Sequence, residues 1–236
     1  MKALYMEDSY MKEFEARVME VKDGKFVVLD QTAFYPNSGG QPHDEGILIR
    51  LSDNKEFKVI FVGKFSGQIS HEVEPEGLQM GDKVKGKIDW QRRYKLMKMH
   101  TSAHILSGVI EKETGALISG NQLNLDKSRL DFSLEKYDWE RIPFWFAESN
   151  KIVDQDLPIE ISFMPREEAE KDSSLFKLVA GFPHKIDTIR IVDIVGVVKE
   201  ADGGTHVKST KEVGHLKFLK AGNKGKNNRR IYYELE

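Results

Sequence analysis

Cysteine is absent from this chain of 236 residues. Its absence excludes a disulfide framework, and it leaves no thiolate to serve as a metal ligand or as a nucleophile. Long apolar runs are missing as well, so the sequence predicts no membrane-spanning helix and no membrane partner. The opening residues 1–3 lack the character of a secretory signal, and we therefore expect a cytoplasmic protein.

A strong charge of either sign is also missing. The chain carries 36 basic and 38 acidic side chains, a formal net charge of −2, so any contact with nucleic acid must come from a local basic patch. Hydrophobic residues make up 39% and charged residues 31%, which is typical of a soluble globular protein. The length suffices for one large domain or two modest ones.

Residues 1–88 are rich in short β patterns. Partial alternation over 14–21, a turn at 22–25 and the apolar run 26–29 predict a hairpin, with further strands at 46–51, 56–62 and 83–88. Several short strands with almost no helical periodicity predict a small N-terminal β-barrel domain over 1–88. The turn-rich segment 34–42, with Gly39-Gly40-Gln41, is either a pair of β-turns or a place where the backbone approaches a ligand closely.

The pattern changes at Asp89, which predicts the start of a second domain over 89–236. Asp89 can cap a helix that runs from Trp90 to about Thr114, and Gly115 can end it. A second helix over 138–151 is also expected. Strands are expected at 129–133, 157–164, 188–198, 215–219 and 230–234. The predicted class is α+β, with a central antiparallel sheet and a helix that carries a metal site.

Two pairs of residues predict that metal site. His100 and His104 stand four apart on the expected helix and share one face. Asp202 and His206 have the same spacing in a remote segment, where Gly203-Gly204 permits a tight turn. Two histidines at this spacing, taken alone, are more often surface or core residues that bind no metal. The zinc-protease signature is excluded because Thr101 stands where that signature has Glu. Zn²⁺ binds His nitrogen and Asp oxygen, so the four residues together predict a zinc site.

The remaining histidines have no comparable partners in the sequence. They are expected to be ordinary surface or packing residues: His43, His71, His184 and His215.

Basic residues gather near the C-terminus. Residues 208–230 carry eight basic side chains against one acid, Glu212, and the stretch 222–228 is expected to be a loop. Such a run is usually a solvated face, but lysines on a loop also suit phosphate contacts that do not read the base. Arg92 and Arg93 add positive charge to the histidine helix. The residues predicted to contact the phosphates of an RNA are Arg92, Arg93, Lys224, Lys226, Arg229 and Arg230.

Several short motifs, in order, resemble the AlaX family of free-standing alanyl-tRNA editing proteins, which are similar to the editing domain of alanyl-tRNA synthetase. The motifs are Phe34-Tyr35-Pro36, Gly39-Gly40-Gln41, Asp44-Glu45-Gly46, His100-Thr101-Ser102-Ala103-His104, Arg129-Leu130-Asp131-Phe132, Gly203-Gly204-Thr205-His206, Thr210-Lys211-Glu212-Val213-Gly214, Lys224-Gly225 and Arg229-Arg230-Ile231. They cover nearly the whole chain, and the N-terminal segment resembles the medium-length members. Two positions depart from the family pattern: Asp202 replaces a cysteine, and Asn121 follows Gly120 where the family often has serine.

The resemblance implies hydrolysis of the ester that joins a wrong amino acid, serine or glycine, to tRNA for alanine. Zinc would be the cofactor, mischarged tRNA(Ala) the partner, and no obligate protein partner is inferred. Thr32, Gln41, Ser102 and Asn121 are the residues expected to recognise the serine hydroxyl, because a hydrogen-bonding pocket rejects analogues that lack the group. The sequence leaves open whether the metal activates water or only orients the substrate, and whether Asp202 binds it directly or through water.

Two other functions remain open from the sequence. A general metallohydrolase of small esters or peptides would need no basic tail. A non-catalytic tRNA-binding module would need no metal, and its histidines would be structural.

Overall fold

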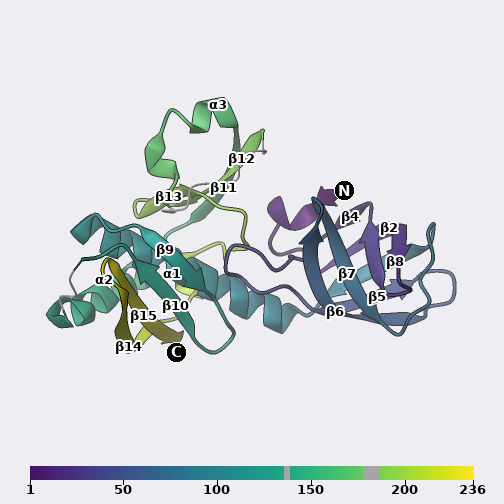
Figure 1. Cartoon of the computed structure of the whole chain (residues 1–236), viewed down its shortest axis with the longest axis horizontal. Coiled ribbons are helices and arrows are strands. Elements are labelled where there is room, and N and C mark those ends of the chain that lie inside the picture. The colour runs from purple at the N-terminus through teal and green to yellow at the C-terminus, as the bar shows by residue number, and fades with distance from the viewer. Residues whose placement is uncertain (136–138, 178–186) are drawn as a thin grey trace. The chain divides into compact units, whose positions relative to one another are not determined.

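The computed structural model of the chain describes residues 1–135, 139–177 and 187–236 (Figure 1). Contacts divide the chain into two compact units, residues 1–96 and residues 97–236. Antiparallel sheets dominate both units, and α-helices are few in the described ranges, so the chain is a mixed α and β protein. The predicted class is confirmed at this level, while the domain boundary at residue 88 stays a prediction.

The first unit is built from six strands that pair in a closed order, β2-β3-β7-β6-β5-β8, with β8 returning to β2. Buried and exposed residues alternate along β2, so Phe14, Ala16 and Val18 point into the core. The hairpin expected over 14–29 is confirmed. The strands are β2 (Glu13–Lys22), β3 (Phe26–Leu29), β5 (Gly46–Arg50), β6 (Glu56–Phe65), β7 (Gln68–Glu74) and β8 (Lys83–Ile88). A short strand, β1 (Lys2–Ala3), pairs in parallel with β4 (Gln31–Thr32), and the 3-10 helix η1 (Leu4–Met6) follows β1.

Helix α1 (Trp90–Thr114) has the bounds that its end signals predict. The carboxylate of Asp89 accepts a hydrogen bond from the backbone N–H of Arg92 at 3.1 Å, which is an N-cap. The helix ends at Gly115, whose φ of 71° lies in the left-handed region that favours glycine. No helix within the described ranges has both the length and the apolar character that crossing a bilayer requires.

A buried ion pair lies in the first unit, between Arg93 on α1 and Asp44, and neither side chain has exposed area. Arg93 Nε donates to both carboxylate oxygens at 3.0 Å, and its other nitrogens donate to the carbonyls of Ser9 and Ala33. The backbone N–H of Tyr35 donates to the same carboxylate at 2.6 Å. Complete pairing of this kind offsets the cost of taking two charges out of water.

Arg93→Met is expected to destabilise the protein by about 3–5 kcal/mol, because the substitution leaves the Asp44 carboxylate buried without its counter-ion. Chemical denaturation followed by circular dichroism measures the change. The matched control is Arg92→Met, which removes an ion pair to the half-buried Glu45 and a hydrogen bond to the His43 carbonyl, and which is expected to cost about 1–2 kcal/mol. Equal losses in the two variants would contradict the structural role of the buried pair.

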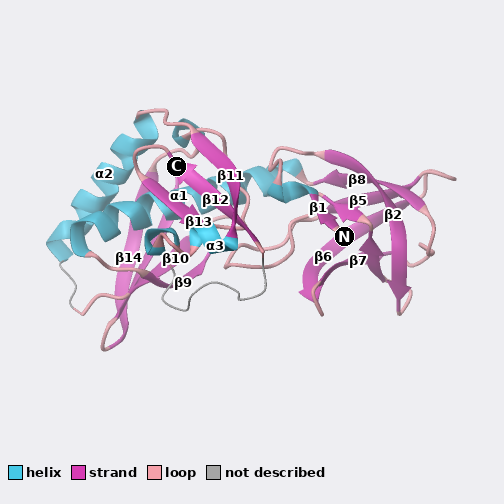
Figure 2. Ribbon diagram, turned by 90° about the horizontal axis from the view of Figure 1, so that it is seen from above, coloured by secondary structure: helices cyan, strands magenta, loops and turns pink. Residues whose placement is uncertain are grey.

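The second unit contains a four-stranded antiparallel sheet in the order β14-β15-β10-β9 and a three-stranded one in the order β11-β12-β13. Figure 1 shows the four strands side by side in front of α1, and Figure 2 shows α2 beside β14. The strands are β9 (Ile118–Gln122), β10 (Ser128–Phe132), β11 (Ile159–Pro165), β12 (Thr188–Ile194), β13 (Val198–Ala201), β14 (Leu216–Gly225) and β15 (Asn228–Leu235). The helices are η2 (Trp139–Arg141), α2 (Ile142–Asp154), α3 (Arg166–Ala169), η3 (Ser173–Leu175) and η4 (Thr210–Glu212).

One face of the four-stranded sheet packs against α1. The Tyr233 hydroxyl donates to the Met99 carbonyl at 3.3 Å and lies 3.0 Å from the Ser102 hydroxyl. Ser128 Oγ donates to the Met99 sulfur at 3.3 Å. On the same side, Phe146 of α2 contacts Tyr233, with ring centroids 6.4 Å apart. These contacts fix the helix that carries His100 and His104 onto a rigid sheet.

The structure corrects two sequence predictions. The run 188–198, expected as one strand, forms β12 and part of β13, because the chain turns at Gly196, where φ is 80°. The stretch 222–228, expected as a loop, is a β-hairpin: β14 continues to Gly225 and a two-residue turn leads into β15. The second helix begins at Ile142, after η2, and its expected first residue, Asp138, lies outside the described residues.

Candidate metal centre

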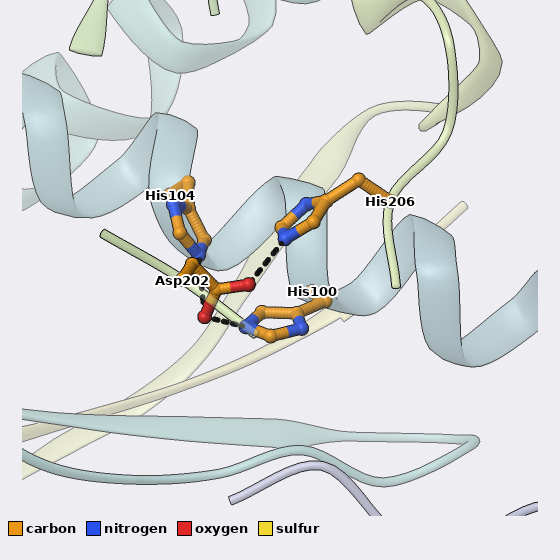
Figure 3. A group of neighbouring side chains, drawn as sticks. All are labelled: His100, His104, Asp202 and His206. Carbon is orange, nitrogen blue, oxygen red and sulfur yellow. Dashed lines mark hydrogen bonds and ion pairs between the residues drawn. The ribbon is translucent and has the colours of Figure 1, made fainter. Parts of the chain in front are cut away.

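Four side chains from two remote segments converge in the second unit. Helix α1 supplies His100 and His104, and the segment after β13 supplies Asp202 and His206 (Figure 3). One donor atom of each lies within 4.8 Å of the donors of the other three. All three imidazoles are buried and Asp202 is half-buried. The residues that the two four-residue spacings single out are therefore brought together.

The three histidine Nε2 atoms surround the carboxylate of Asp202. His206 Nε2 lies 2.9 Å from Asp202 Oδ2, His100 Nε2 lies 3.5 Å from Oδ1, and His104 Nε2 lies 3.9 Å from Oδ1. The imidazole centroids are 4.4 to 5.0 Å apart. Equivalent nitrogens thus face one small volume, which is the arrangement that a shared cation requires.

Neighbouring side chains fix the orientation of two of these imidazoles. Thr101 Oγ1 lies 3.1 Å from His206 Nδ1, and Glu200 Oε1 lies 2.9 Å from His104 Nδ1. The contact with Glu200 is an ion pair between two buried side chains. Contacts on Nδ1 leave each Nε2 directed at the common volume, as second partners do for metal-bound histidines.

Gly204 makes the close approach of the two segments possible. A Cβ at this position would overlap the imidazole of His100 and would lie 3.0 Å from Asp202 Oδ2. The Gly204 backbone N–H donates to that same oxygen at 2.6 Å. Arg190 supports the turn from the other side by donating to the Asp202 carbonyl at 2.9 Å. The turn therefore aims the carboxylate as well as the histidine.

Burial sets the charge of the cluster. It lowers the pKa of His100 well below its usual range and that of His206 to about 4, so both imidazoles are neutral near pH 7. Burial would also lower the pKa of His104, but the Glu200 carboxylate outweighs it and raises this pKa to about 9. Burial would raise the pKa of Asp202, yet the three histidines hold it well below its usual range.

These donors fit a divalent cation. The neutral imidazoles of His100 and His206 offer the lone pair that a metal needs, His104 would release its proton on binding a metal, and the ionised carboxylate of Asp202 supplies negative charge. Three nitrogens and one oxygen are a ligand set that Zn²⁺ accepts. The group His100, His104, Asp202 and His206 could therefore hold a metal ion.

Comparison with known proteins yields long matches. The chain is 54% identical over 238 residues to the alanyl-tRNA editing protein AlaX-M of Methanosarcina barkeri, a match that covers 99% of this chain and 98% of the relative. The AlaX-M protein of Saccharolobus solfataricus is 40% identical over 234 residues, with 99% and 98% covered. The chain belongs to the AlaX-M family of alanyl-tRNA editing proteins.

The family is related to a much larger enzyme. The alanine–tRNA ligase of Pyrococcus abyssi is 41% identical over 223 residues, which are 93% of this chain but 24% of the ligase. Two family models also match: tRNA synthetases class II (A) over residues 2–92, and the threonyl and alanyl tRNA synthetase second additional domain over residues 189–232. The second match includes Asp202 and His206. This AlaX-M member therefore corresponds to one part of a ligase.

The substrate-recognition residues predicted in the second unit have different surroundings. Ser102 is buried, and its hydroxyl donates to the Met99 carbonyl at 2.8 Å and faces Tyr233, on the sheet side of α1. Asn121 pairs across the sheet with Leu130, so its side chain lies on the face that packs toward α1, and it is half-buried. Asn121 is thus the more accessible of the two.

Thr32 and Gln41, which belong to the first unit, have no exposed area. Thr32 Oγ1 lies 2.8 Å from His71 Nε2 and accepts from the backbone N–H of Phe34 at 3.1 Å. His71 Nδ1 lies 3.0 Å from the Val27 carbonyl, which can only accept, so Nε2 is the acceptor for the threonine hydroxyl. Thr32 therefore completes a buried network, and its predicted role in serine recognition stays a prediction.

Four of the six basic residues predicted to bind tRNA are at least partly accessible to solvent, and two are buried. Lys224 and Lys226 are exposed on the β14–β15 hairpin, while Arg92 and Arg230 are half-buried. Arg93 is fully buried on Asp44, and Arg229 is buried with its guanidinium donating to the carbonyls of Gly225 and Lys226. The last two are placed to hold the fold together.

The other histidines lie outside the metal centre where the structure describes them. His71 belongs to the buried Thr32 network, His43 packs against Phe61, and His215 lies at the surface, 2.8 Å from Asp154. His184 lies outside the described residues. Sequence reasoning missed Glu200 and Thr101, although each stands within two residues of a predicted ligand.

His104→Ala is expected to lose most of the bound metal, because it removes one of three converging nitrogens. Elemental analysis of purified, zinc-loaded protein measures the metal content per chain. His215→Ala is the matched control, since it removes a histidine that is paired with a carboxylate at the surface. A full equivalent of zinc in His104→Ala would show that the assignment is wrong.

Glu200→Ala is expected to weaken zinc binding by about 10- to 100-fold, the usual effect of removing a partner that orients a ligand. Competition with a chromophoric chelator measures the dissociation constant. Glu200→Gln, which keeps the shape and an acceptor oxygen, should recover part of the loss. The control is Asp154→Ala, which breaks the exposed carboxylate–histidine pair with His215. If Asp154→Ala lost as much zinc affinity as Glu200→Ala, the positioning role of Glu200 would be contradicted.

Proposed function

We propose that this AlaX-M member is a trans-editing hydrolase that removes a wrong amino acid, serine or glycine, from mischarged tRNA(Ala). One observation carries the proposal: three imidazoles and a carboxylate converge in a chain that matches alanyl-tRNA editing proteins from end to end. The proposed cofactor is zinc, held by His100, His104, Asp202 and His206. Release of the amino acid by ester hydrolysis needs no ATP.

When bound at this centre, zinc would supply a Lewis acid that polarises the ester and lowers the pKa of water. The protein's own part is to hold the donors in place. Thr101 and Glu200 orient two of the histidines, and Gly204 keeps the Asp202 carboxylate beside His206. Asn121, on the α1-facing side of the sheet, is proposed to hydrogen-bond the substrate, whereas Thr32 and Gln41 remain predicted recognition residues.

The proposed tRNA contacts come from Arg92, Lys224, Lys226 and Arg230. Phosphate contact requires a charge that solvent can reach, and the exposed lysines of the hairpin meet this requirement best. Arg93 and Arg229 are left out because their guanidinium groups are buried against acceptors of the protein. A modest net charge of −2 is compatible with such a local patch.

We propose two domains with the bounds expected from the sequence. Residues 1–88 form a β-barrel domain that contains the Gly-Gly-Gln loop, and residues 89–236 form a metal-dependent deacylase domain. The family model that covers 189–232 supports the second assignment. Such a protein would act in the cytoplasm, where charged tRNA is used.

Two alternative functions predict different experimental results. A general metallohydrolase of small esters or peptides would act without tRNA, and the long match to editing proteins argues against it. A non-catalytic tRNA-binding module would bind tRNA without a metal. The three buried histidines around the half-buried Asp202 argue against that rival, because burying this many polar side chains together without a shared task is costly.

Removal of the metal is expected to lower the rate of Ser-tRNA(Ala) deacylation by at least about 100-fold, in line with the loss of water activation and ester polarisation. Single-turnover release of radiolabelled serine measures the rate in untreated, chelated and zinc-restored protein. Zinc should restore it, and His215→Ala should behave as the unaltered protein does.

Correctly charged Ala-tRNA(Ala) is the substrate control and should be hydrolysed far more slowly. Full activity after complete removal of the metal would refute the zinc-dependent mechanism. Equal hydrolysis of a simple seryl ester would instead favour the general metallohydrolase.

A further inference from the structure

The outer face of the four-stranded sheet, the face turned away from α1, carries an ordered set of polar side chains. Residues opposite each other on antiparallel strands share a face. The register therefore places Gln122, Arg129, Tyr232 and Lys220 in one row across β9, β10, β15 and β14. The adjacent row consists of Gly120, Asp131, Arg230 and Gly222. Two residues of this second row, Gly120 and Gly222, have no side chain.

One carboxylate holds two arginines in this array. Asp131 accepts from Arg230 Nε at 2.6 Å and Nη2 at 2.8 Å, and from Arg129 Nη1 at 2.7 Å. Arg129 Nε donates to Gln122 at 3.2 Å. The arginines are therefore fixed in direction, and their two charges exceed that of the single carboxylate. Fixed guanidinium groups lose little entropy when they bind a phosphate.

Tyr232 lies among the positive charges at the centre of the face. Lys220 Nζ lies 4.8 Å above its ring, and the Arg230 guanidinium lies 5.9 Å from it. A hydrogen bond from Arg230, with the charges of Arg230, Lys224 and Lys220, lowers the pKa of the Tyr232 hydroxyl against the opposing effect of burial. Lys217, further along β14, is neutralised by Glu234 and Glu236. The positive charge is thus concentrated between Arg129 and Lys224.

We infer that this face, formed by Arg129, Lys220, Lys224 and Arg230 around Tyr232, binds the sugar–phosphate backbone of tRNA. Charge complementarity identifies the partner, since a flat row of fixed cations matches a row of phosphates and makes position-fixing contacts. The inference rests on the proposed function, and it extends the tRNA contact from the hairpin across three strands. The sheet separates this face from α1, so its contacts serve binding rather than chemistry.

Gly222 provides a direct test, because a Cβ at this position would meet nothing within 4 Å. Gly222→Glu places a carboxylate beside Arg230 without a steric clash, and Gly222→Gln adds a neutral side chain of the same size. Lys220→Gln removes one cation of the face, and Lys151→Gln removes an exposed lysine of α2 as a control. The probe is uncharged tRNA(Ala), labelled with a fluorophore, and anisotropy gives the dissociation constant at several salt concentrations.

Gly222→Glu and Lys220→Gln should each weaken tRNA binding by about 5- to 10-fold near 0.1 M salt. Each should also lower the slope of log K against log salt by about 0.7–0.9, the effect of one lost phosphate contact. Gly222→Gln and Lys151→Gln should stay within about twofold of the unaltered protein. Zinc content and the thermal midpoint report whether each variant is folded.

Unchanged affinity and slope in both Gly222→Glu and Lys220→Gln would overturn the inference. Equal losses in Gly222→Glu and Gly222→Gln would overturn it as well, because size rather than charge would then be the cause. The probe carries no amino acid, so binding is measured apart from chemistry. A chain that binds tRNA through this face but releases no serine would refute the proposed function alone.

Discussion

Burial of the Asp202 carboxylate among three imidazoles is the constraint on which the second unit depends. An ionised acid taken out of water needs compensating charge or hydrogen bonds, and here they come from His206, the Gly204 backbone and the turn that Arg190 supports. Helix α1 must hold His100 and His104 in position beside this carboxylate, which requires that another part of the unit pack against the helix. The four-stranded sheet does so through the Tyr233 contacts with Met99 and Ser102.

Local signals explain what could be predicted from the sequence. The cap at Asp89 and the left-handed glycine at 115 are short-range features, so the bounds of α1 were predictable. Residues 222–228 have the glycine, asparagine and lysine content of a loop. Only the pairing of residues 222–225 with residues 228–230 makes this stretch a β-hairpin. Cross-strand pairing depends on backbone hydrogen bonds and leaves little trace in composition. The missed strand β7 belongs to the same class of error.

The site shows the same division. Ligands at four-residue spacing on a helix or in a tight turn were predictable, because spacing alone puts them on one side. Partners such as Glu200 act through a contact that only the fold creates. Burial was equally hidden in the sequence. Arg92 and Arg93 are neighbours with the same side chain, yet Arg92 is half-buried beside Glu45 and Arg93 is fully enclosed with Asp44. A positive charge in a sequence does not reveal whether solvent can reach it.

The absence of sulfur from the four donors has a consequence for how the metal centre responds to oxidants. A thiolate ligand can be oxidised stepwise to sulfenic, sulfinic and sulfonic acids, and each step ejects or weakens a bound metal. Imidazole nitrogen and carboxylate oxygen have no such series of sulfur oxidation states, and the chain has no cysteine. Peroxide that would disable a thiolate centre leaves Asp202 chemically unchanged, so proofreading by such a centre would continue when oxidants are abundant.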